Sequence, residues 1–445
     1  MSEYWCELVW TRTGIERDVV LSIVDGRIAS VTPDRPVPAG ASVLPGLTLP
    51  GLANAHSHAF HRALRGRTQS GTGTFWTWRD QMYKAAGRLD PDTYLALARA
   101  VYAEMALAGI TSVGEFHYLH HGPDGTPYDD PNAMGHALIE AARQAGVRLT
   151  LLDTCYLHGG LTADGHQPLA GVQRRFGDGG SDGWYERWSA LRGDANTRIG
   201  AAIHSVRAFA TKDDYAGWAA RTEGVPVHVH LSEQPAENAA CLAHYGLTPT
   251  GLLDAHGFWS PNATAVHATH LTDADIAALA RSGAGVCFCP TTERDLADGI
   301  GPAGDLVRAG VPLSLGSDSQ AVIDLFEEAR AVELDERLRT GRRGHFTSAA
   351  LLAYATTVGH RALGWPDAGR IEVGALADLT TIGLDSVRLA GTVPRLAGEA
   401  AVFAAAAGDV THVLVDGRVV VRDGVHQLVE AVPRALTTAI HDLFR

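Results

Sequence analysis

Short apolar runs that end in polar residues recur through the middle of the chain. Eight can be distinguished, at 49–56, 110–116, 148–155, 197–203, 225–230, 264–267, 285–289 and 311–315. Segments between them, such as 91–108 and 272–282, have apolar residues at helical spacing. Eight strand–helix units in about 320 residues predict an α/β fold, a parallel (β/α)₈ barrel. The alternative is an open doubly wound sheet, but no Gly-x-Gly-x-x-Gly turn follows a strand.

The two ends of the chain share a different pattern. Val-Asp-Gly-Arg occurs at 24–27 and again at 415–418, each time between short β-branched runs. Asp-Gly between such runs is a strong signal for a β-hairpin. We therefore expect a small β-sandwich module built from both ends. The predicted division is 1–48 and 373–445 for this module, with a terminal helix, and 49–372 for the barrel.

A glycine-rich stretch interrupts the strand–helix rhythm at 158–198. Loops of this length within a compact domain are usually functional or mobile. We expect an excursion or a lid over one face of the barrel here.

Composition narrows the class of protein. Apolar residues make up 46% of the 445 residues, which excludes global disorder, and the formal charge of −13 argues against nucleic-acid or anionic-membrane partners. The chain has neither an apolar run of membrane-spanning length nor a basic, apolar leader near its first residue. Its five scattered cysteines form no disulfide pattern, so a cytoplasmic location is expected.

Histidines and one aspartate stand where four of the predicted strands end. His56 and His58 close the first run, His230 the fifth and His267 the sixth, and Asp318 follows the eighth. Residues two apart on an extended chain point to the same side, so the first pair can reach one ion. Imidazoles with a carboxylate are a suitable ligand set for a divalent metal, with Zn²⁺ as first choice, although iron and manganese accept the same donors.

Two further observations bear on the chemistry. Glu233 lies three residues after His230, where a carboxylate can take a proton from a water activated by the metal. Lys84 and Lys212 are the only lysines, so the fourth strand cannot supply a carboxylated lysine that would bridge two metals. A single metal ion is therefore expected.

The segment 49–58, Leu-Pro-Gly-Leu-Ala-Asn-Ala-His-Ser-His, resembles the first-strand motif of the amidohydrolase superfamily, in particular of its one-metal aminohydrolase branch. The resemblance covers essentially the whole chain. The segments at 60–66, 75–83, 204–207, 230–234 and 266–270 are similar to the formimidoylglutamate deiminase family. That family hydrolyses N-formimidoyl-L-glutamate to N-formyl-L-glutamate and ammonia in histidine degradation.

The resemblance implies a role for each candidate residue. The metal would be held by His56, His58, His230 and Asp318. Glu233, His267 and Asp318 would be catalytic, with His267 orienting the attacking hydroxide and the tetrahedral intermediate. The substrate would be bound by His61, Arg79, Tyr118, His204 and Arg207. The family commonly has glutamine in place of His61, and an imidazole there would make this contact dependent on pH.

A small anionic substrate agrees with the arginines, because a guanidinium binds carboxylate through two hydrogen bonds. Arg174 and Arg175, within the excursion, are further candidates. Two other activities stay open: an aminohydrolase acting on guanine or an adenosine derivative, which would need aromatic and amide groups around a ring, and an imidazolonepropionase. A non-catalytic barrel would be expected to have lost some of the ligands. The family also implies a homodimer.

Overall fold

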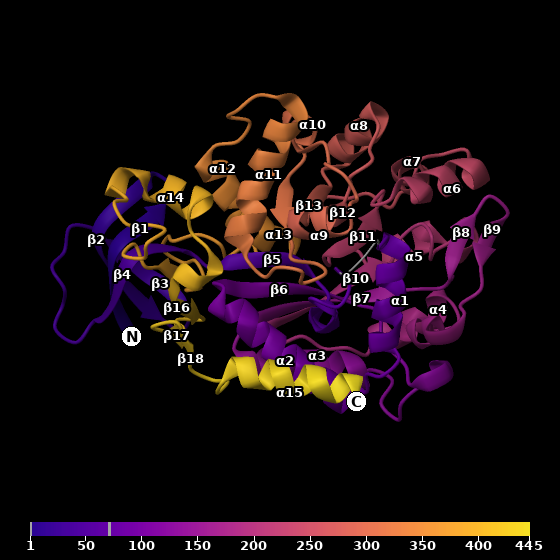
Figure 1. The fold of residues 1–445 in the computed structure, drawn as a ribbon, viewed down its shortest axis with the longest axis horizontal. Coiled ribbons are helices and arrows are strands. Elements are labelled where there is room, and N and C mark those ends of the chain that lie inside the picture. The colour runs from indigo at the N-terminus through magenta and orange to yellow at the C-terminus, as the bar shows by residue number, and fades with distance from the viewer. Residues whose placement is uncertain (1, 70–72) are drawn as a thin grey trace.

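All eight predicted runs become parallel strands of one barrel sheet (Figure 1). The computed structural model describes residues 2–69 and 73–445. The barrel strands are β5 (Leu52–Ser57), β6 (Ile110–His117), β7 (Arg148–Cys155), β10 (Thr197–Ile203), β11 (Val227–Leu231), β12 (Ala263–His267), β13 (Gly285–Phe288) and β14 (Leu313–Leu315). They are buried almost throughout, as expected for parallel strands covered on both faces. The (β/α)₈ prediction is confirmed.

The first and last strands of the barrel meet at the candidate metal site. Ser57 forms a parallel bridge with Asp318, just after β14. The Asp318 amide donates to the carbonyl of His56 at 3.0 Å, and the His58 amide donates to the carbonyl of Asp318 at 3.3 Å. Closure of the barrel thus brings three predicted ligands together through their own backbones.

Helices follow the barrel strands and cover the outside of the sheet (Figure 1). The two expected ones form as α2 and α8, and the side chains of Asp90 and Thr272 accept the backbone N–H groups of Thr93 and Asp275 at their starts. The helices of the described chain are α1 (Phe75–Ala86), α2 (Pro91–Leu107), α3 (Ala133–Ala145), α4 (Ser181–Trp188), α5 (Tyr215–Arg221), α6 (Pro235–Tyr245), α7 (Pro249–Ala255), α8 (Asp273–Ser282), α9 (Pro290–Asp295), α10 (Ala303–Arg308), α11 (Leu325–Thr340), α12 (Ser348–Ala353), α13 (Gly359–Ala362), α14 (Ala397–Phe403) and α15 (Val432–Phe444).

Strands from both chain ends form a separate eight-stranded sheet beside the barrel (Figure 1). Its order is β18-β17-β16-β15-β4-β1-β2-β3. The strands are β1 (Ser2–Thr11), β2 (Gly14–Val24), β3 (Arg27–Thr32), β4 (Ser42–Pro50), β15 (Leu379–Ile382), β16 (Val410–Val415), β17 (Arg418–Arg422) and β18 (Val425–His426). Both Val-Asp-Gly-Arg segments form the expected hairpin turns, with positive φ at Asp25, Gly26, Asp416 and Gly417. The terminal helix α15 leaves this sheet and packs against α2 of the barrel.

The first apolar run serves both sheets. Leu49 and Pro50 pair with β15 as the end of β4, whereas Leu52 opens the barrel strand β5. Gly51 lies between them, and a Cβ atom at this position would collide with the side chain of Thr111. A glycine is therefore required where the chain passes from one sheet to the other.

The excursion at 158–198 is tied firmly to the barrel. It contains a short hairpin, β8 (Gly160–Thr162) with β9 (Gly165–Gln167), and helix α4. Arg187 on α4 forms a paired ion bridge to Asp153 of β7, at 2.8 and 2.9 Å, and reaches Asp178 at 2.9 Å. Trp184 Nε1 donates to the same Asp153 carboxylate at 2.9 Å.

We expect Arg187→Met to lower the free energy of unfolding by about 3–5 kcal/mol, because it leaves two buried carboxylates without their cation. Urea denaturation measures this change. The matched control is Arg174→Met, which breaks an exposed ion pair with Asp124 and is expected to cost at most about 1 kcal/mol. Equal losses in the two variants would contradict the anchoring role of Arg187.

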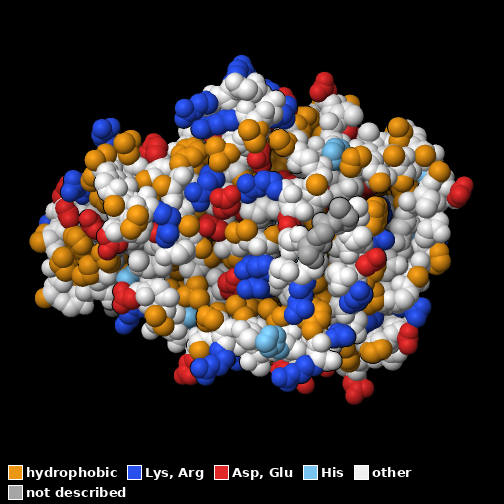
Figure 2. Space-filling view, in the orientation of Figure 1, with side chains coloured by type: hydrophobic (Ala, Val, Ile, Leu, Met, Phe, Trp, Pro, Cys, Tyr) orange, Lys and Arg blue, Asp and Glu red, His pale blue; other side chains and the backbone are white. Residues whose placement is uncertain are grey.

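No helix in the described ranges is long and apolar enough to cross a membrane. On the face shown in Figure 2, basic and acidic side chains are interspersed.

Candidate active site

Four buried side chains converge at the carboxyl ends of the barrel strands. His56 Nε2 lies 3.1 Å from His230 Nε2 and 3.3 Å from Asp318 Oδ1. His58 Nε2 lies 3.4 Å from both of these partners. Ligand atoms about 2.0–2.1 Å from a tetrahedral metal lie about 3.3 Å from one another, so these spacings suit one ion with three imidazoles and a carboxylate.

The hydrogen bonds of two of the three histidines also fit a metal. His58 Nδ1 lies 2.9 Å from the carbonyl of Phe116, and His230 Nδ1 lies 2.9 Å from the carbonyl of His204. A carbonyl only accepts, so Nδ1 carries the proton and Nε2 presents a lone pair. Lone pairs that face one another at these distances repel unless a cation lies between them, and a backbone carbonyl behind each imidazole is typical of metal-binding histidines.

Burial keeps the imidazoles neutral, as metal binding requires. It lowers the pKa of His56 and takes the pKa of His58 and His230 well below the usual value. Burial alone would raise the pKa of Asp318, but its contacts with the neighbouring imidazoles, that of His56 first, bring it below its usual range. The ligand set is therefore a carboxylate with neutral histidines.

A second buried group, His117, His120 and Asp153, also has donor atoms close together. Its carboxylate is already held by both terminal nitrogens of Arg187. The first group is therefore the better candidate for a metal site.

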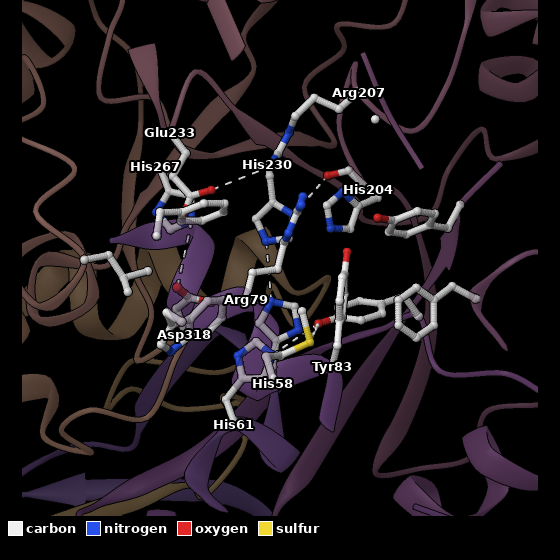
Figure 3. A pocket seen from close by; sticks show the side chains of 18 of the residues that line it. His58, His61, Arg79, Tyr83, His204, Arg207, His230, Glu233, His267 and Asp318 are labelled. Carbon is white, nitrogen blue, oxygen red and sulfur yellow. Dashed lines mark hydrogen bonds and ion pairs between the residues drawn. The ribbon is translucent and has the colours of Figure 1, made fainter. Parts of the chain in front are cut away.

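Glu233 and His267 stand beside the ligands (Figure 3). His267 Nε2 lies 3.6 Å from Glu233 Oε1 and 3.9 Å from Asp318 Oδ2. Burial raises the pKa of Glu233, although His267 and Arg207 oppose the shift. Burial would lower the pKa of His267, but the charges of Glu233 and Asp318 and a hydrogen bond to Glu293 hold it well above the usual value. His267 therefore faces the site as a hydrogen-bond donor.

The two predicted arginines line the same pocket but differ in their partners (Figure 3). Arg207 Nε lies 3.0 Å from Glu237 Oε2, and Arg207 Nη2 lies 3.8 Å from Glu233 Oε2, so carboxylates of the protein already face its charge. Arg79 has no ion pair within the described residues and stacks over the ring of Trp76, 4.5 Å from its centroid. Arg79 is therefore the better placed of the two to receive an anionic group.

The other predicted substrate contacts are also lining residues of this pocket. Tyr118 Oη lies 3.1 Å from His61 Nε2, while the His204 ring packs 4.4 Å from that of Tyr156, centroid to centroid. Burial lowers the pKa of His61 to about 3. The imidazole is thus neutral across the physiological range, and the expected pH dependence of its contact is wrong.

Arg174 and Arg175 lie outside the pocket. Arg174 pairs with exposed Asp124, while Arg175 is buried and donates to backbone carbonyls, among them that of His121 at 2.8 Å. Both have structural partners, so neither replaces Arg79 or Arg207.

Several lining residues were not predicted from the sequence. Gly159, Gly160 and Phe176 come from the excursion, which thus forms one wall of the pocket. Gln173, also from the excursion, donates to the hydroxyls of Tyr83 at 3.0 Å and Tyr156 at 3.4 Å. Tyr156 follows β7 directly, so its place at a strand end was a signal that could have been used. The remaining unpredicted lining residues are Phe75, Trp78, Met82, Tyr83 and Leu296.

Comparison with known proteins agrees with this geometry. Residues 47–420 match the Amidohydrolase family. The chain is 37% identical to the formimidoylglutamate deiminase of Pseudomonas aeruginosa, over the full length of both proteins, and 29% identical to the 8-oxoguanine deaminase of the same organism, over 95% of each.

Solved structures show the same fold. An amidohydrolase from Brucella melitensis superposes with a TM-score of 0.90 at 31% identity over the whole of both chains. An adenosine deaminase from Xanthomonas campestris, solved with bound zinc, gives a TM-score of 0.82 at 25% identity, covering 99% of this chain and 97% of that one.

Proposed function

This chain belongs to the amidohydrolase family, and we propose that it hydrolyses N-formimidoyl-L-glutamate to N-formyl-L-glutamate and ammonia, a step of histidine degradation. The observation that carries the proposal is the pocket beside the ligand set, which holds Arg79 without a protein carboxylate partner in the described chain and Arg207. A substrate with two carboxylates needs such fixed positive charge, because the protein as a whole is acidic.

We further propose that one divalent ion, with Zn²⁺ as first choice, is held by His56, His58, His230 and Asp318. When bound there, it would bring the pKa of a coordinated water to near 7. The residues fit such an ion because their donor atoms lie 3.1–3.4 Å apart and burial keeps the imidazoles neutral.

The residues around the ligands have distinct tasks in this reaction. A water oxygen bonds to the formimidoyl carbon, and Glu233 accepts the proton that this oxygen loses. Glu233 delivers this proton to the terminal nitrogen, and the second proton of the added oxygen passes to the same nitrogen as its bond to carbon breaks, so that N-formyl-L-glutamate and ammonia are released. His267 donates a hydrogen bond to the oxygen that has been added, which stabilises its developing charge.

Arg79 is expected to bind a substrate carboxylate, and Arg79→Met should therefore raise KM for N-formimidoyl-L-glutamate by about 10- to 100-fold, the loss of one charge-assisted contact. Steady-state ammonia release measures the change. Arg174→Met serves as a control for general effects of losing an arginine, because Arg174 is paired at the surface. An unchanged KM in the Arg79 variant would contradict the assignment.

A second candidate function is deamination of a purine or an adenosine derivative. The rings of Phe75, Trp78, Tyr156 and Phe176 in the pocket wall favour it, because aromatic side chains stack on a base. An ammonia-release assay with N-formimidoyl-L-glutamate, guanine and S-adenosylhomocysteine separates the two. Turnover of a purine with no turnover of N-formimidoyl-L-glutamate, by enzyme loaded with metal, would overturn the first proposal.

A further inference from the structure

His267 is held in a backbone conformation that is uncommon for residues other than glycine. It ends strand β12 with φ = +69°, and the following Ala268 has φ = +51°. Non-glycine residues occupy this left-handed region only where the surroundings impose it, and such residues gather at active sites. This strained turn directs the imidazole towards the ligand set. It does not decide which way round the ring lies about the Cβ–Cγ bond.

A contact with Glu293 further restricts the ring of His267. It lies in the first turn of α9, after the next barrel strand, and is 5% exposed. Its Oε1 accepts the backbone N–H of Cys289 at 2.9 Å and lies 3.3 Å from His267 Nδ1. The Glu293 carboxylate is thus held just after the end of β13, while it contacts the His267 ring at the end of the adjacent strand β12.

We propose that Glu293 is a positioning residue that sets the orientation of the His267 ring. A carboxylate accepts hydrogen bonds, so this contact takes the Nδ1–H of the ring and directs Nε2, the nitrogen that donates in the site, at Glu233 and Asp318, 3.6 and 3.9 Å away. If the ring turned over, a carbon atom would face the Glu293 carboxylate and the hydrogen bond would be lost. Glu293 itself lines no part of the pocket, so its effect passes through His267.

The reaction assigned to His267 rests on the proposed function. The positioning role of Glu293 is tested with a double-mutant cycle of Glu293 and His267. Glu293→Gln is expected to lower kcat for ammonia release by about 10- to 100-fold, the usual effect of removing a group that orients an active-site ligand, with KM within about twofold of wild type. In a His267→Asn background, Glu293→Gln should change kcat by less than about twofold, because its target is gone. Metal content is measured in every variant and should stay at the wild-type level.

Glu328→Gln is the matched control. Glu328 is also buried and accepts the backbone N–H of Thr291 in α9 at 2.9 Å, but it does not contact His267. Its kcat should stay within about twofold of wild type. Equal losses from Glu293→Gln in both backgrounds, the same loss in Glu328→Gln, or no loss at all would each overturn the proposal.

The cycle is independent of the substrate assignment. If N-formimidoyl-L-glutamate is not turned over, the same four proteins are compared on whichever compound of the assay panel releases ammonia. Failure of the proposed function therefore appears in the wild-type enzyme, whereas failure of the positioning role appears only in the ratios between variants.

Discussion

Glu233→Gln is expected to reduce kcat for ammonia release by about 10²- to 10⁴-fold, the range that proton transfer by a placed side chain contributes. Glutamine keeps the size of the side chain but cannot take a proton from the attacking water. Glu233 is 5% exposed, and its Oε1 lies 3.6 Å from His267 Nε2. The variant should retain its metal and bind substrate, so KM and metal content are measured with kcat.

Glu223→Gln controls for the loss of a glutamate charge as such. Glu223 is exposed in the segment between α5 and β11. Loss of its charge should leave kcat unchanged. A Glu233 variant that keeps more than about one tenth of wild-type kcat would contradict the proton-transfer role. Loss of metal in that variant would point instead to an effect on the ligand set.

His230→Asn is expected to abolish metal retention and to lower kcat/KM by about three orders of magnitude or more, since a bound metal supplies several kcal/mol of transition-state stabilisation. His230 Nε2 lies within 3.4 Å of two other ligand nitrogens, and its Nδ1 is held by the carbonyl of His204. Elemental analysis after dialysis gives metal per chain, and ammonia release gives the activity.

His228→Asn offers a control on the same strand. His228 is buried two residues before His230, but its Nε2 lies 3.2 Å from the carbonyl of Ala362 and belongs to no ligand set. This variant should retain its metal. If both variants kept metal equally well, His230 would not be a ligand.

The meeting of these side chains could be predicted because it depends on strand order, whereas the choice of His56, His58, His230 and Asp318 as ligands came from the family resemblance. In a parallel barrel every carboxyl end lies at one rim, so polar residues at the ends of the first, fifth and eighth strands must meet there. His56, His230 and Asp318 do so, and closure of the sheet next to Ser57 brings the first and last strands into contact. His267 ends β12 at the same rim, whereas His270, three residues later, lies with its Nε2 2.8 Å from the carbonyl of Asp298.

The partners of these residues could not be predicted in the same way. Glu293 reaches His267, and Glu237 reaches Arg207, only because particular turns bring separate strand ends together. Such contacts depend on backbone conformations with positive φ, as at Ser232 and His267, which have no signal in residue type. The sequence identified Arg207 as a basic residue of the site, but it did not show that the carboxylate of Glu237 lies against its guanidinium.

The state of His61 shows the same limit. Its intrinsic pKa made a titrating contact a reasonable expectation. One of the aromatic residues packed against it, Trp78 at 5.0 Å between ring centroids, comes from helix α1, whose docking cannot be read from local pattern. Burial then lowers its pKa to about 3 and removes the titration from the physiological range.

The shared sheet of the two chain ends has a consequence for synthesis of the protein. Strand β4 ends at Pro50, but its neighbour β15 begins at Leu379, more than 300 residues later. At roughly 5–20 residues per second, a ribosome needs on the order of tens of seconds to make the missing partner. During that interval β4 presents an open edge to other nascent chains, a known route to aggregation. Yield should therefore respond to translation speed and to chaperones that shield strand edges.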